Sequence, residues 1–83
     1  MTTEKRILVL TQGFVFVGDY TATKTDATLT NASCVRVWGT TKGLGQLALQ
    51  GPQEATVLDY VGYVEAPRSS VVLSIRCDEE KWT

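Results

Sequence analysis

The feature that most constrains the fold is a set of short runs in which β-branched residues alternate with polar ones. Val, Ile and Thr together account for 24 of the 83 residues. Such side chains favour the pleated, half-buried surface of a sheet, and a period of two is typical of strands. The sequence therefore predicts an all-β fold.

Turn residues divide this pattern into segments. Five segments carry it, at 6–11, 14–23, 27–38, 56–67 and 71–78. Asn31 to Ser33 interrupts the third segment, either as a bulge or as a bend between two strands, so five to six strands are expected. Phe14 and Phe16 share one face of the second segment, and we expect this pair in the core. Tight turns between the first three segments indicate an antiparallel meander, which predicts a small antiparallel barrel or a strongly bent sheet.

The region 39–55 has a different composition from the strands. It reads GTTKGLGQLALQGPQEA and contains four glycines and one proline. An irregular loop or a short helical turn over 44–50 fits this composition, and Gly51-Pro52 is a typical helix stop. Long connections in compact domains are often functional.

Length and charge limit the possible partners. We expect a single domain over 1–83, with a core so small that assembly into a homo-oligomer is expected. The net charge of −1 argues against nucleic acid as a partner. Every apolar run is too short to span a membrane, so a cytoplasmic protein with no membrane contact is expected, in the host cytoplasm if a phage encodes it.

Few side chains in the sequence could hold a metal or a cofactor. The sequence has no His, and Cys34 and Cys77 form no CxxC pair. A disulfide between these two cysteines stays open, although buried free thiols are expected of cysteines inside apolar strand patterns. We predict no metal and no cofactor.

Catalysis is not expected either. Without His, neither a Ser-His nor a Cys-His arrangement is available. The carboxylates Asp59 and Glu65 lie in a strand pattern, and nothing brings them together at a cleft. The sequence predicts a protein that is not an enzyme.

The best candidate for a binding site is the segment RVWGTTKGLG at 36–45. It lies in a window between Asp26 and Glu54 whose only charged residues are Arg36 and Lys42. Backbone N–H groups of glycines, hydroxyls and cations are the usual ligands of phosphate, and a Trp can stack a base. The candidate ligand-binding set is Arg36, Trp38, Gly39, Thr40, Thr41, Lys42, Gly43 and Gly45.

A structural interpretation of the same segment stays open. The glycine spacing matches neither a Walker A loop nor GxGxxG. In this interpretation the segment is a wide turn, Trp38 packs in the core and Leu44 closes one end of a barrel. At the other end of the chain, Trp82 is expected to cover the end of the core or to meet a partner.

Several segments together resemble a family of small phage and prophage proteins of unknown function. They are GFVFVG (13–18), LTNA (29–32), CVRVWGTTKGLGQLAL (34–49), TVLDYVG (56–62) and CDEEKW (77–82). WGTTKGLG at 38–45 is the most specific of them. The resemblance implies a viral setting and lends no catalytic residue.

A looser similarity links GFVFVGDYTATKTDATL, at 13–29, to the first motif of Sm-like small barrels. The second Sm motif ends in an Arg-Gly-like turn, whereas here Cys77 follows Arg76. Only the barrel architecture is therefore implied, and not RNA binding.

These expectations combine into one functional hypothesis with two alternatives. A small phage protein without catalytic groups is expected to be an oligomeric sponge, which sequesters a small phosphorylated ligand such as a nucleotide immune signal and so counters host defence. The first alternative is a protein-interaction or assembly module with an exposed apolar patch. The second is a small-barrel binder of single-stranded nucleic acid.

Overall fold

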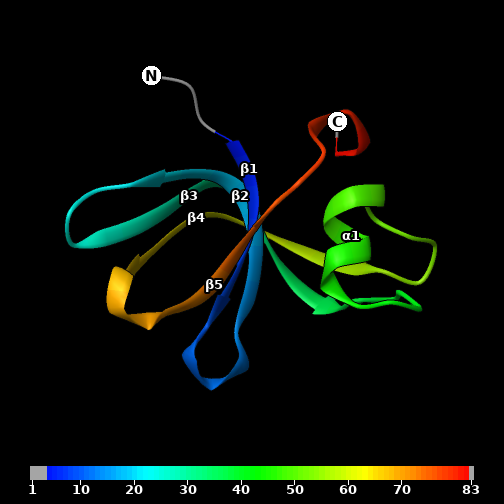
Figure 1. Ribbon diagram of the computed structural model, residues 1–83, viewed down its shortest axis with the longest axis horizontal. Helices are drawn as coiled ribbons and strands as arrows, with labels where there is room; N and C mark the ends of the chain where they lie inside the picture. Colours follow the sequence, from blue (N-terminus) through cyan, green and yellow to red (C-terminus); the bar gives the residue numbers. More distant parts are fainter. Residues whose placement is uncertain (1–3, 83) are drawn as a thin grey trace.

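A computed structural model of the chain, which describes residues 4–82, contains one antiparallel sheet of five strands. The strands are β1 (Glu4–Leu10), β2 (Val15–Ala22), β3 (Asp26–Val37), β4 (Val57–Pro67) and β5 (Val71–Arg76), in the order β4-β3-β2-β1-β5 (Figure 1). The first four strands form a meander, and β5 returns to pair with β1. Because β4 and β5 do not pair with each other, the sheet is not closed. The prediction of an all-β fold with a bent sheet of five to six strands is confirmed.

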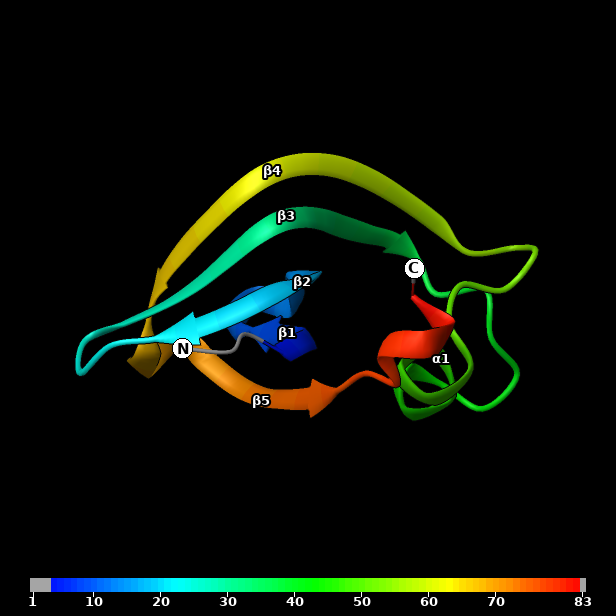
Figure 2. The ribbon, with the colours of Figure 1, turned by 90° about the horizontal axis from the view of Figure 1, so that it is seen from above.

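Irregular pairing bends the sheet. The register between β3 and β4 shifts beside Asn31, which has a φ of 50°, and again beside Gly62, which has a φ of 89°. An extra residue in one strand increases the local twist and bends it. Segment 27–38 therefore contains one continuous bent strand rather than two, and Figure 2 shows β3 and β4 arching over β2 and β1.

The two faces of the sheet carry separate hydrophobic clusters, and β1 contributes to both. One face also carries the short helix, and its cluster is called the helix-side cluster. The cluster on the other face is formed by strand residues and is called the sheet-only cluster. Ile7 belongs to the helix-side cluster, whereas Leu8 and Leu10 belong to the sheet-only cluster, as expected of alternating side chains. The buried members of the helix-side cluster are Ile7, Val15, Val17, Val35, Leu47, Ala48 and Cys77. Those of the sheet-only cluster are Leu8, Leu10, Ala27, Leu29, Ala32 and Ala66.

The prediction for the Phe pair is wrong for one ring. Phe16 packs against the sheet-only cluster, but Phe14 is exposed at the start of β2. The two rings stack on each other with their centroids 6.4 Å apart. Phe14 lies between the 3-10 turn Thr11–Gly13 and the first residue of β2, Val15, so its ring stands at the hairpin end of the strand pair and not over the sheet.

One short helix lies on the helix-side face, α1 (Leu44–Gln50). It begins after Gly43 and ends at Gly51, and both glycines have positive φ. Leu47 and Ala48 are its buried residues. A helical turn at 44–50 ending at Gly51 is as predicted, and a helix of seven residues depends on its packing for stability.

The C-terminal segment holds α1 in place. After β5, the backbone N–H of Asp78 and the indole N–H of Trp82 both donate to the carbonyl oxygen of Ala48, at 2.9 and 3.2 Å. A 3-10 turn, Glu79–Lys81, lies between these two residues. Trp82 packs against the helix-side cluster, which confirms that it covers the end of the core.

Both cysteines are free thiols, Cys77 buried and Cys34 partly buried. Burial raises the pKa of the Cys77 thiol to about 11. Across residues 4–82, no helix combines the length and the apolar character needed to cross a membrane.

Candidate functional site

The structure separates the predicted site residues into an ion pair, an exposed ring and a closed loop. Arg36, near the end of β3, is paired with Asp59 on β4, and its Nη1 lies 3.1 Å from Oδ2. Trp38 is not in the core as the structural interpretation expects, since 44% of its surface is exposed. Its ring lies beside Gly43, where an added Cβ would be 4.0 Å from Trp38 Cζ3.

The backbone donors of the loop are already engaged by side chains of the same segment. The N–H groups of Thr41 and Lys42 donate to Oε1 of Gln46, at 3.1 and 2.7 Å. The Thr41 hydroxyl donates to the same oxygen, and the N–H of Gly43 donates to Oγ1 of Thr40 at 3.0 Å. A phosphate bound at 40–43 would have to displace these bonds.

Gln46 explains why the loop closes. It stands three residues after Gly43, the residue that precedes α1, and its side chain reaches back to N–H groups upstream of the helix. The position of Gln46 is that of the Gln in a capping box, but its donors are the two residues before the N-cap Gly43 and not Gly43 itself. The sequence signal is a Gln three positions after the glycine that opens the helix, without the Ser or Thr of a capping box.

The glycines of the segment have different roles. At Gly39, where φ is 66°, an added Cβ would lie 2.3 Å from the backbone of Ala55 and Thr56. The Thr56 hydroxyl donates to the carbonyl oxygen of Trp38 at 2.7 Å, so the two ends of the region 39–55 are held together. An added Cβ at Gly45, within α1, meets nothing within 4 Å.

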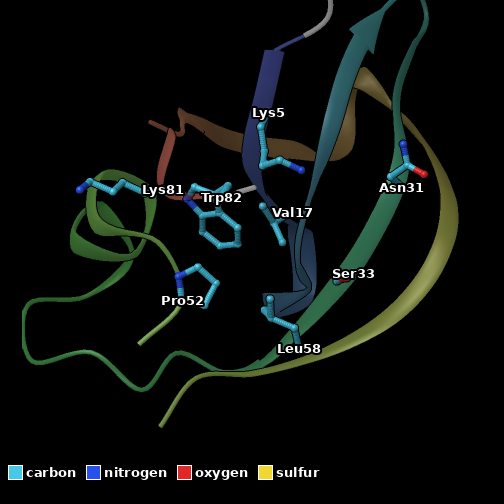
Figure 3. Close-up of a pocket in the computed structure, with 8 residues that line it drawn as sticks. All are labelled: Lys5, Val17, Asn31, Ser33, Pro52, Leu58, Lys81 and Trp82. Atoms are coloured by element: carbon cyan, nitrogen blue, oxygen red, sulfur yellow. The ribbon is translucent and has the colours of Figure 1, made fainter. Parts of the chain in front are cut away.

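A cavity of about 220 Å³ lies on the helix-side face, away from this loop. The residues that line it are Lys5, Val17, Asn31, Ser33, Pro52, Leu58, Lys81 and Trp82 (Figure 3). They come from four strands, from the segment after α1 and from the C-terminal segment. None of them belongs to the predicted site.

Apolar and polar groups share the walls of this cavity. Figure 3 shows the Trp82 ring and Pro52 facing Val17 and Leu58 across the cavity, while Lys81 extends away from it. The Lys5 ammonium lies 3.6 Å from Oδ1 of Asp19, which is a long contact for an ion pair. This arrangement offers a flat surface and one cation to a small molecule.

The outer edge of β4 is the third notable surface. β4 pairs only with β3, and its side chains Tyr60, Val61 and Tyr63 are exposed, the two tyrosines by 72% and 61%. Val57 on β4 and its register partner Val37 on β3 are also exposed, so the exposed strip continues along the edge to the end of β3, with neighbouring side chains on alternate faces of the sheet. An unpaired, apolar edge strand is a surface on which further strands can add.

The part of the chain that the structure describes contains no group of three or more His, Cys, Asp or Glu side chains able to hold a metal ion. Three carboxylates, Glu4, Asp19 and Asp59, form ion pairs. Glu4 accepts hydrogen bonds from Arg6 and from Arg76, and these bonds lower the pKa of its carboxyl.

Comparisons with protein-family models, with curated proteins and with solved structures give no match to this chain. The resemblance to small phage proteins therefore stays a prediction from the segments quoted above.

Proposed function

We propose that this protein is a non-enzymatic assembly protein, which works by adding a second copy of the chain to the edge of its sheet at β4. The observation that carries the proposal is the edge itself. β4 has 11 residues, pairs on one side only and exposes Tyr60, Val61 and Tyr63.

Edge strands of this kind are usually protected. Natural sheets shorten them, cover them or place lysines along them, because free N–H and C=O groups recruit other strands. β4 carries one such protection, the register shift beside Gly62, but it has no lysine, and its charged residues are Asp59 and Glu65. Its length and its apolar side chains favour strand addition, in which backbone bonds give affinity and side chains give specificity.

A second copy is a suitable partner for two reasons. A chain of 83 residues buries a small core, so covering the exposed strip would add stability. The other edge of the sheet, β5, carries Arg76 as its only charged residue, and it also exposes Val72 and Leu73. Asp59 and Arg76 are already paired within the chain, with Arg36 and Glu4, so the exposed apolar side chains of the two edges, rather than their charges, favour head-to-tail pairing of copies.

The test is the mass of the protein in solution, measured by light scattering over a concentration series. The wild type should exceed the 9.1 kDa of one chain. The double variant Tyr60→Lys/Tyr63→Lys should lower the measured mass to that of the monomer, because lysines block edge pairing. The matched control is Leu49→Lys, which places the same charge on α1 at a side chain that is 64% exposed, and which should leave the mass unchanged.

A third variant distinguishes the two ways of pairing. Val72→Lys should dissolve a head-to-tail assembly that joins β4 to β5, but it should not affect a two-fold pairing of β4 with β4. A wild type that stays monomeric at the highest concentration, about 1 mM, would refute self-assembly. The proposal retains the oligomeric part of the expected function and does not involve the loop 36–45.

A further inference from the structure

We propose that the cavity beside Trp82 is a binding site for a small molecule with one flat ring system and one anionic group, either a phosphate or a carboxylate. The proposal is independent of assembly through β4. It rests on the composition of the cavity, on the way its walls are fixed and on its size.

The walls are fixed before any ligand arrives. The indole N–H of Trp82 donates to the carbonyl oxygen of Ala48, and the backbone N–H of Trp82 donates to the carbonyl oxygen of Glu79 at 3.1 Å. Across the cavity, Val17 is a buried residue of the sheet. A site whose side chains are already held in place loses less conformational entropy on binding.

The composition of the lining selects the ligand. The Trp82 ring offers a stacking surface, and Leu58 and Pro52 complete an apolar wall suited to a flat ring. No acid is among the lining residues, and because Lys81 extends away from the cavity, Lys5 is the one cation beside it (Figure 3). An anion on the ring is therefore favoured over a cation.

Lys5 is the cation in position to receive that anion. Its side chain is 20% exposed, and its contact with Asp19 is 3.6 Å long. The Nδ2 group of Asn31 donates to Oδ2 of the same Asp19, at 3.2 Å, so that carboxylate keeps a partner if Lys5 turns to a ligand. The hydroxyl of Ser33 in the lining adds a neutral donor.

The size limits the ligand. Sites for drug-sized ligands usually measure about 300–1,000 Å³. A cavity of about 220 Å³ is smaller, so it accepts one or two fused rings and leaves a larger ligand partly outside.

Nuclear magnetic resonance of the two Trp indole N–H groups gives a local readout, and Trp38→Phe assigns the signal of Trp82. The probes are orotate for a carboxylate and adenosine 5′-monophosphate for a phosphate, with adenosine and inorganic phosphate as the separated halves of the latter. At least one of the two complete probes should shift the Trp82 signal saturably, and adenosine and inorganic phosphate should each bind at least tenfold more weakly than that probe. If neither complete probe shifts that signal at 5 mM, the proposal is overturned.

Two lysine variants locate the site. Lys5→Met, which keeps the aliphatic part of the side chain, should weaken binding of the responding probe at least tenfold, whereas Lys42→Ala should change it less than twofold. If instead Lys42→Ala weakens binding at least tenfold and Lys5→Met changes it less than twofold, the anion binds at the loop 36–45 and the proposal is overturned. Because Lys5→Met also removes the contact with Asp19, Lys5→Arg provides a folded control that should bind within about threefold of the wild type.

Discussion

Arg36 on β3 is paired with Asp59 on β4, with Nη1 3.1 Å from Oδ2 across two adjacent strands. The pairing occupies the cation that stands closest to Trp38 in the strand sequence. Within the segment 36–45, Arg36 therefore serves a cross-strand ion pair.

The first prediction concerns this pair. Its side chains are 62% and 47% exposed, so the ion pair should contribute little. Arg36→Ala and Asp59→Ala should each lower the free energy of unfolding by less than about 1 kcal/mol, and the coupling between them should vanish in 1 M salt. Urea unfolding of the single and double variants measures this, and a coupling above about 2 kcal/mol would contradict it.

The second prediction contrasts two glycines of the candidate loop. Gly39→Ala should destabilise the protein by about 2 kcal/mol or more, because its Cβ would overlap the backbone of Ala55 and Thr56. Gly45→Ala should be neutral or stabilise by up to about 1 kcal/mol, because alanine favours the helix and nothing lies within 4 Å. Thermal unfolding of both variants tests the difference, and equal effects would refute it.

The third prediction concerns the cap on α1. Gln46→Ala should remove the acceptor of the Thr41 and Lys42 N–H groups, which should then exchange with solvent at least several-fold faster. The loss of stability should be about 1 kcal/mol. Gln46→Glu keeps the acceptor oxygen and should preserve slow exchange. If both N–H groups exchange as slowly in Gln46→Ala as in the wild type, the cap has no role.

The fourth prediction is a dependence of stability on alkaline pH. Burial raises the pKa of the Cys77 thiol from 9.0 to about 11, so between these values the unfolded chain releases a proton that the folded chain keeps. The free energy of unfolding should therefore fall as pH rises from 9 to 11, by at most about 2–3 kcal/mol from this group. Cys77→Ala should show a shallower fall over the same range, since it removes only this thiol. Parallel curves for the two proteins would contradict the assignment.

Local patterns were sufficient to predict the strands and the helix. Alternation alone placed the second, third and fifth strands, and a glycine followed by a proline marked the end of α1 at Gly51. These signals are readable because a sheet repeats every two residues and a helix end needs a residue that tolerates positive φ.

The candidate site was harder to predict, because its geometry depends on contacts between distant segments. Nothing in the sequence near Arg36 indicates that Asp59 lies opposite it, since that depends on the shifted register beyond Gly62. The cavity was missed because Lys5 and Trp82 belong to opposite ends of the chain. The exposure of Phe14 was missed because alternation shows which residues share a face, but not which of them lie beyond the end of the strand.

The pairing of β5 with β1 has a consequence for the order of events in biosynthesis. Arg6 donates to Ser74, 68 residues along the chain, and the segment after β5 supplies the bonds that hold α1. Folds dominated by such distant contacts form slowly, because the chain must close a long loop before the contacts stabilise it. A nascent chain that has emerged only as far as β4 therefore presents an unfinished sheet and an unsupported helix, and both are completed only when β5 and the segment through Trp82 have emerged.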